Sequence, residues 1–187
     1  SAPGVGIIDS QSGTQTIQIR GINSTYGNAP VGYYLDELPF SLIGNTQVPD
    51  IRTYDLERVE ILRGPQGTLY GDGSIGGTIR ILTRDPNLQS FQADLDVMGS
   101  ETTDGDNNTA LKGMLNVPLK DDVAAFRLVA SHEELGGWID NPASGAKDTN
   151  SRNVDAYRAK LRLAPTDKLD VVLSAWHSDE DASGSSN

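Results

Sequence analysis

Hydrophobic and polar residues alternate along much of this chain, and a two-residue period is typical of β-strands with one apolar face. In the first half the alternation is clear at residues 14–20, where Ile17 and Ile19 share a face. Three further short segments are predicted to be strands, at residues 31–35, 59–63 and 78–83. Residues 48–56 are compatible with one or two helical turns. The first half is therefore predicted to combine short strands with a little helix.

From residue 91 the predicted strands become longer. They lie at residues 91–99, 109–117, 124–133, 154–163 and 169–177, and each has about the 9–11 residues that a tilted membrane strand needs. In the first of them, four apolar residues face one side and three polar residues the other: Phe91, Ala93, Leu95 and Val97 against Gln92, Asp94 and Asp96. The same alternation also fits a soluble antiparallel sheet with one solvent-exposed face.

The connections between these strands favour a membrane barrel. Short turns at residues 118–123 and 164–168 alternate with longer polar links at residues 100–108 and 134–153, which is the order of periplasmic turns and external loops in outer-membrane barrels. Five strands cannot close, because the smallest membrane barrels use about 8 and a lumen that holds a domain needs roughly 22. Open edges in a bilayer would leave backbone groups unsatisfied. We therefore expect a fragment of a longer chain, ending in a third external loop at residues 183–187.

A glycine-rich connection lies between the predicted strands at residues 59–63 and 78–83. Residues 71–76 within it, GDGSIG, fit the G-x-G-x-x-G pattern of a nucleotide loop. A dinucleotide fingerprint needs a strand that enters the first glycine and a helix that leaves the last, whereas a further alternating segment follows here. The context therefore argues against nucleotide binding.

The same region carries a specific family resemblance. Residues 55–71, DLERVEILRGPQGTLYG, followed by Ile75-Gly76-Gly77, resemble the plug domain of TonB-dependent outer-membrane receptors. Ile19-Arg20-Gly21 and Tyr33-Tyr34-Leu35-Asp36 match earlier plug motifs in the same order. The resemblance covers residues 3–86, and the remainder resembles the start of the family's barrel. It implies an α+β plug domain with a small mixed sheet at residues 1–86, lacking its N-terminal part. Residues 87–187 would be the first five or so antiparallel strands of a transmembrane β-barrel of about 22 strands.

The resemblance also implies a function and partners. Such a receptor lies in the outer membrane of a Gram-negative bacterium, in contact with its lipid. It binds a scarce small-molecule solute at the external face, such as a siderophore-type metal chelate, cobalamin or an oligosaccharide, and imports it to the periplasm. TonB supplies the energy by pulling on a TonB box, which would precede Ser1. Plug loops at the outer face would help bind the ligand, with Tyr26, Asn28, Phe40 and Leu42 as candidates, although ordinary packing is the alternative for the apolar residues of the second loop.

The resemblance also implies structural roles for two groups of plug residues. Glu57, Arg58, Glu60 and Arg63 would pair with charges on the inner barrel wall and latch the plug, whereas the alternative is a solvated or locally ion-paired strand face. Arg58 and Glu60 are predicted to point to the same side of their strand. Arg80 departs from the asparagine common at its position in the family, and Asp72 from a basic or polar residue. The backbone of the plug would depend on its glycines, which are Gly21, Gly64, Gly71, Gly76 and Gly77.

Composition excludes several other classes of protein. The net charge of −11 argues against a nucleic-acid or anionic-lipid partner held by general electrostatics. Because cysteine is absent, neither a disulfide framework nor a thiolate metal site is possible. No apolar run approaches the roughly 18 residues of a spanning helix, and no signal segment opens the chain.

Catalytic and metal-binding patterns are not found either. His132 and His177 lie on different predicted strands without an i, i+4 partner, so a zinc site is not expected. Residues 104–115 begin like a calcium loop but carry Thr109 and Leu115 where that loop needs glycine and glutamate. We therefore predict no enzyme, cofactor or bound metal. The alternatives to a transporter are a soluble β-rich binding module, which would fold alone as a monomer in water, and a nucleotide-dependent enzyme.

Overall fold

The computed structural model describes residues 4–10, 14–22, 30–39, 47–49, 54–67, 74–142, 145 and 147–183. The chain divides into two compact units, Ser1–Arg84 and Asp85–Asn187. No helix among these described residues is long and apolar enough to cross a membrane.

The first unit contains two small sheets. One is antiparallel in the order β1-β2-β5, built from β1 (Val5–Ser10), β2 (Thr14–Ile19) and β5 (Gln47–Pro49). The other has the order β4-β3-β7-β6, built from β3 (Val31–Leu35), β4 (Leu38–Pro39), β6 (Leu56–Arg63) and β7 (Gly77–Thr83). β3 runs parallel to β7, whereas the other neighbours are antiparallel, so the predicted mixed sheet is confirmed.

The helical turns expected over residues 48–56 are wrong where the structure describes them. Val48 and Pro49 belong to β5, and Leu56 begins β6; residues 50–53 lie outside the described part. Val48 pairs with Gln15 of β2. Pairing with a neighbouring strand therefore decides the local conformation in a segment whose own pattern is ambiguous.

The core of the first unit forms where β3 and β7 lie side by side. Its buried side chains are Ile19, Val31, Tyr33, Leu35, Ile79 and Ile81, and Val5, Leu56 and Ile61 pack against them. Burying each large apolar side chain stabilises the fold by about 1.5–3 kcal/mol. β7 lies between β3 and β6, so the strand that closes the glycine-rich connection is also the centre of the sheet.

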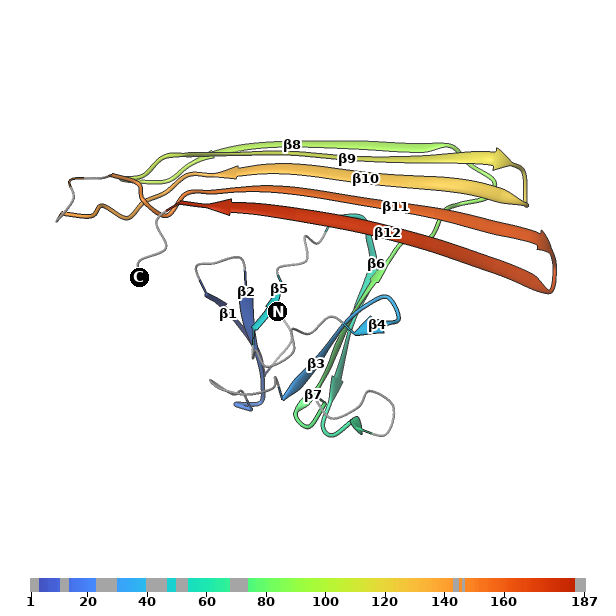
Figure 1. The fold of residues 1–187 in the computed structure, drawn as a ribbon, viewed down its shortest axis with the longest axis horizontal. Helices are drawn as coiled ribbons and strands as arrows, with labels where there is room; N and C mark the ends of the chain where they lie inside the picture. The colour runs from blue at the N-terminus through green and yellow to red at the C-terminus, as the bar shows by residue number, and fades with distance from the viewer. Residues whose placement is uncertain are drawn as a thin grey trace. The chain divides into compact units, whose positions relative to one another are not determined.

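The second unit is one antiparallel meander in the order β12-β11-β10-β9-β8. Its strands are β8 (Gln92–Glu101), β9 (Asn107–Lys120), β10 (Ala124–Leu135), β11 (Arg152–Thr166) and β12 (Leu169–Ala182). Both short turns, at residues 121–123 and 167–168, lie at one end of the sheet, and the longer connections, at residues 102–106 and 136–151, lie at the other (Figure 1). The predicted alternation of short and long connections is confirmed.

The register gives this sheet one apolar and one polar face. One row across all five strands is entirely apolar: Ala93, Leu115, Leu128, Ala159 and Ala175. A row on the other face is almost entirely polar: Asp96, Lys112, Ser131, Ala156 and Ser178. On the apolar face Leu95 and Val97 are exposed over 70% and 72% of their surface. Large apolar side chains that remain this exposed mark a surface made for an apolar environment.

Candidate functional site

The predicted latch residues form a network of charges on the mixed sheet. Arg58 and Glu60 lie on the same face of β6, as predicted, with the Arg58 Nε to Glu60 Oε1 distance at 2.7 Å. Arg58 also pairs with the neighbouring Glu57. Across the sheet, Arg80 of β7 lies opposite Glu60 and donates from Nη1 to its Oε2 at 2.7 Å, while its Nη2 reaches Glu37 Oε1 at 2.7 Å.

The electrostatics of this network favour its charged form. The hydrogen bond from Arg58, followed by the charges of Arg80 and Arg58, lowers the pKa of the Glu60 carboxyl below its ordinary value of 4.5. The hydrogen bond to Glu60 in turn raises the pKa of Arg58. The Arg80 side chain is 16% exposed and Glu37 is 82% exposed, so the network runs from the half-buried sheet surface into solvent. Local ion pairing is therefore present on this strand face, and the latch stays a prediction.

Sequence reasoning assigned neither Arg80 nor Glu37 to this network. For Arg80, the departure from the asparagine common in the resembled family was the available signal, because a long cation opposite Glu60 on a neighbouring strand can form a cross-strand pair. Arg63, the fourth predicted latch residue, lies exposed at the end of β6 opposite Gly77.

The predicted glycines occupy turns and close contacts where they are described. Gly21 has a φ of 81° just after β2, and Gly64 has a φ of 95° just after β6. Gly76 donates its amide to Pro30 O at 2.8 Å. At Gly77 the φ is 146°, and a Cβ there would lie 2.4 Å from Leu62 O, so a side chain is excluded both by conformation and by space.

The remaining predicted site residues lie outside the described part of the structure. These are Tyr26, Asn28, Phe40 and Leu42, proposed for ligand binding, together with Gly71 and the unusual Asp72.

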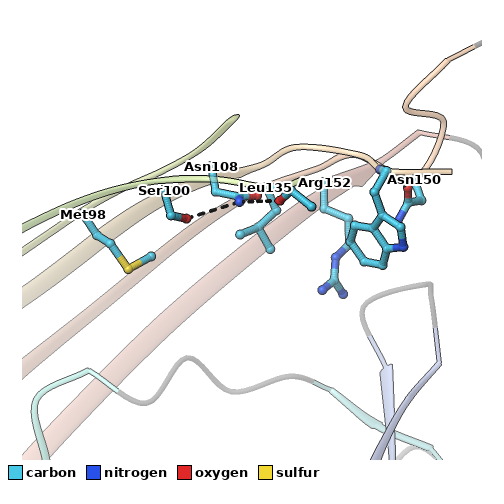
Figure 2. A pocket seen from close by; sticks show the side chains of 8 residues that line it. Met98, Ser100, Asn108, Leu135, Asn150 and Arg152 are labelled. Atoms are coloured by element: carbon cyan, nitrogen blue, oxygen red, sulfur yellow. Dashed lines mark hydrogen bonds between the residues drawn. The ribbon is translucent and has the colours of Figure 1, made fainter. Parts of the chain in front are cut away.

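A pocket of about 490 Å³ lies at the loop end of the five-stranded sheet. It is lined by Met98, Ser100, Thr102, Asn108, Leu135, Trp138, Asn150 and Arg152, which come from four strands and from both long connections (Figure 2). None of these residues was predicted for a site. Among them, Trp138 was the conspicuous signal, because it is a large aromatic residue in a polar connection.

Asparagine side chains hold the walls of this pocket together. Asn108 Nδ2 donates to Ser100 Oγ at 3.3 Å and to Thr102 Oγ1 at 3.0 Å (Figure 2). Its Oδ1 accepts from the Gly136 amide at 2.9 Å. Asn150 Oδ1 accepts from the amides of Trp138 and Ile139 at 2.7 and 2.9 Å. These bonds fix the connection that carries Trp138 against the strands.

Backbone contacts join the two long connections directly. The Asp106 amide donates to Gly137 O at 2.8 Å. A Cβ at Gly105 would lie 2.7 Å from the same carbonyl, so the two loops approach more closely than a side chain would permit. The pocket is therefore largely preformed, as small-molecule sites usually are.

The pocket offers an aromatic and aliphatic surface with one cation at its edge. Trp138 is 58% exposed, and Met98 and Leu135 add apolar surface. Arg152 Nη1 lies 3.8 Å from Glu180 Oε1. Such a lining can bind an organic ligand by stacking and shape. Among the described residues, no group of His, Cys, Asp and Glu side chains is arranged to hold a metal ion.

Comparison with known proteins places both units in one kind of protein. Residues 1–78 match the family model described as the TonB-dependent Receptor Plug Domain. The pesticin receptor of Yersinia pestis is 32% identical over 155 residues, which are 82% of this chain and 22% of the receptor. The ferric aerobactin receptor of Klebsiella pneumoniae is 26% identical over 67% of this chain and 17% of its own length. The chain thus spans about a fifth of the curated relatives it matches.

Solved structures agree with these relatives. The ferric yersiniabactin uptake receptor FyuA from Yersinia pestis superposes with a TM-score of 0.76 at 30% identity, over 96% of this chain and 28% of FyuA. The pyoverdine outer membrane receptor FpvA of Pseudomonas aeruginosa, at 21% identity and a TM-score of 0.72, shares the fold over 96% of this chain and 24% of its own. These relatives are receptors and not enzymes, in agreement with the lack of a predicted catalytic site.

Proposed function

Because this chain belongs to the TonB-dependent receptors, we propose that the whole protein binds a ferric chelate of the siderophore class and imports it across a Gram-negative outer membrane. TonB would drive the transport through a segment of the receptor on the N-terminal side of Ser1.

The observation that carries this proposal is the similarity to the pesticin receptor across both units. The match extends over 155 residues, which is longer than either unit, so it includes the mixed-sheet unit and the antiparallel strands. A soluble binding module would require neither the short and long connections in this order nor a sheet with an exposed apolar face.

The apolar face of β8 to β12 supports a location in the outer membrane. In a bilayer this face would contact lipid, and the polar face with its ion pairs would line the lumen. One such pair joins Lys112 Nζ to Glu133 Oε1 at 2.8 Å across β9 and β10. Charged rows of this kind are compatible with a membrane only when they face a lumen or another part of the protein.

The names of the relatives support iron chelates as the ligand class. Two of them are described as receptors for ferric aerobactin and ferric yersiniabactin, and a third as a pyoverdine receptor. The iron would arrive within its own chelator. We assign ligand contacts to the pocket around Trp138 and to the plug loops that carry Tyr26, Asn28, Phe40 and Leu42.

We further propose that the charged face of β6 contacts the inner wall of the barrel. Glu57, Arg58, Glu60 and Arg63 would exchange partners when the plug moves, because Glu60 and Arg58 already share their charges with Arg80 and Glu57. Exchanging one ion-pair partner for another costs less free energy than losing the partner, because removing one partner of a shielded ion pair costs about 3–5 kcal/mol.

The test is uptake of ⁵⁵Fe-labelled chelates by cells that carry the full-length receptor as their only siderophore receptor. Ferric aerobactin, ferric yersiniabactin and ferric pyoverdine are the probes, and a strain without TonB is the control. We expect saturable uptake of at least one chelate that disappears without TonB. TonB-independent uptake, or recovery of the full-length protein in the soluble fraction, would contradict the proposal.

A further inference from the structure

The segment that leaves the first unit is fastened to the five-stranded sheet by side chains from several strands. We name residues 85–90 the exit segment, since the chain passes through it from Arg84 of the first unit to β8 of the second. The Pro86 side chain within it is fully buried.

Asn116 of β9 makes the central attachment. Its side chain is 0% exposed. Nδ2 donates to Asn87 O at 3.0 Å and to Ser90 O at 2.8 Å, and Oδ1 accepts from the Asn87 amide at 2.8 Å. Arg127 Nη1 approaches the same Oδ1 at 3.4 Å. Both donors and both acceptor sites of one buried amide are thereby used, and three of the four hold the exit segment.

Other residues attach the two ends of the exit segment. Lys160 of β11, 4% exposed, donates from Nζ to Asp85 Oδ1 at 2.8 Å. Gln89 Nε2 donates to Asp122 Oδ1 at 2.9 Å, in the turn between β9 and β10. The exit segment is therefore held by β9, by β11 and by the turn at residues 121–123, which lies at the short-turn end of the sheet.

The register places two of these attachments, those made by Asn116 and Lys160, in one polar row. Gln92, Asn116, Arg127, Lys160 and Ser174 lie opposite one another across the five strands. Arg127 Nη1 also donates to Gln92 Oε1 at 3.1 Å, which fixes the first residue of β8 beside Asn116. The row is therefore a continuous polar support beneath the exit segment.

From this geometry we infer that Asn116 is the positioning residue of a fixed anchor that resists force applied to the plug. A pull on the N-terminal side then deforms the plug between the point of pulling and residue 85. Without the anchor, the six residues extend by at most about 3.3–3.6 Å each and would add up to roughly 20 Å of slack. The plug would then move as a whole before it deforms. TonB as the source of the pull rests on the proposed function; the anchor itself does not.

The experiment is single-molecule pulling on the full-length receptor in a lipid bilayer, with force applied at its N-terminus. In the wild type we expect release of the exit segment as a separate step of up to about 20 Å. This step should follow unfolding of the plug and precede extraction of β8. In Asn116→Ala the step should occur at a lower force or merge with release of the plug.

Asn108→Ala is the matched control for this step. Asn108 lies on the same strand and also uses its Nδ2 and Oδ1, but its partners Ser100, Thr102 and Gly136 lie at the opposite end of the sheet, in β8 and in the long connections. We expect the step in Asn108→Ala to match the wild type. The anchor is refuted if the wild type shows no separate step, or if Asn116→Ala releases it at the wild-type force.

A second variant keeps the test decisive if Asn116→Ala does not assemble. Asp85→Asn removes the ion pair with Lys160 at a half-exposed carboxylate and leaves the Asn116 bonds in place. A lower release force supports the anchor, and an unchanged force contradicts it. The pulling experiment applies the force mechanically and does not need TonB. Failure of TonB-dependent uptake would therefore refute the proposed function but would leave the measured release force of the exit segment unchanged.

The anchor also predicts that Asn116→Ala affects transport of the chelate but not its binding. Asn116→Ala should leave the Kd of the chelate found by the uptake assay unchanged, because Asn116 lies away from the pocket around Trp138. The uptake rate should fall several-fold, since slack absorbs part of the pull. A parallel loss of affinity and uptake would indicate general damage to the receptor and contradict a positioning role.

Discussion

Asp36 accepts hydrogen bonds from both the amide and the hydroxyl of Thr83, which lies 47 residues later in the sequence. The distances are 2.8 Å from the Thr83 amide to Oδ1 and 3.0 Å from Thr83 Oγ1 to Oδ2. Asp36 occupies the turn after β3 with a φ of 52°, and its own amide donates to Ile81 O at 2.8 Å. One residue therefore closes the turn after β3 and fixes the end of β7 beside it.

The first prediction concerns this closure. Asp36→Ala removes the acceptors of a buried amide and hydroxyl and places a less suitable residue at positive φ, which should cost about 1–3 kcal/mol locally. In the full-length receptor we expect exchange of the Thr83 amide hydrogen to accelerate about tenfold or more. Glu37→Ala is the control, because Glu37 is exposed and contributes an ion pair to Arg80. Equal exchange at Thr83 in wild type and Asp36→Ala would show that the two bonds do not stabilise the end of β7.

The second prediction concerns Gly77. Gly77→Ala would place a methyl group 2.4 Å from Leu62 O and 2.9 Å from Ile19 Cδ1, at a φ that side chains disfavour. We expect little or no assembled full-length receptor in outer-membrane fractions, measured by heat-modifiable mobility in gels. Gly67→Ala is the matched control, because no atom lies within 4 Å of a Cβ at that position. Normal assembly of Gly77→Ala would contradict the geometry of the turn.

The third prediction is a pH dependence centred on Glu60. Its folded pKa is lowered, so its contribution to stability is present above the ordinary value of 4.5 and is lost as pH falls through the lower, folded pKa. Glu60→Gln should therefore lower the Tm of the plug at pH 7, and the difference from wild type should shrink below pH 4.5. Glu37→Gln, whose side chain is 82% exposed, is the comparison and should show a smaller effect at pH 7. If the Tm difference between Glu60→Gln and the wild type stayed constant from pH 7 to pH 3, the ionised Glu60 carboxylate would not be the source of the stabilisation.

The parts of the fold that could be predicted from the sequence are those with a strict two-residue period. β9 to β12 have one apolar and one polar face and few alternative registers, so their order and connections follow from the pattern. β1, β4 and β5 were not predicted, because short edge strands acquire their conformation from a neighbour. The pairing of Val48 with Gln15 is visible only once β2 and β5 are in place.

The candidate site was less predictable for the same reason. Arg80 joins Glu60 through pairing of β6 and β7, and Asn116 reaches the exit segment from 26 residues beyond Ser90. Neither relationship has a signature in the local sequence. Family resemblance identified the charged face of β6, but it did not indicate that Arg80 of β7 pairs with Glu60 in addition to Arg58. The pocket around Trp138 requires two loops to meet, which backbone bonds such as Asp106 N to Gly137 O accomplish.

The last prediction concerns Trp138, the largest exposed side chain of the pocket. If the pocket contacts the chelate, Trp138→Ala removes an aromatic surface whose truncation at a binding site commonly costs about 1–2 kcal/mol or more. We expect the Kd of the full-length receptor to rise about 5- to 30-fold for the ferric chelate found by the uptake assay. Trp138→Phe should retain part of the affinity because it keeps a ring that can stack.

Ile139→Ala is the matched control, since Ile139 follows Trp138, shares the Asn150 carbonyl as its amide's partner and does not line the pocket. Its Kd should remain within about twofold of the wild type, as is usual for a surface substitution away from a site. Equal loss of affinity in Ile139→Ala and Trp138→Ala would mean that the loop matters only as a structural element. An unchanged Kd in Trp138→Ala would exclude the pocket and leave ligand recognition to other parts of the receptor.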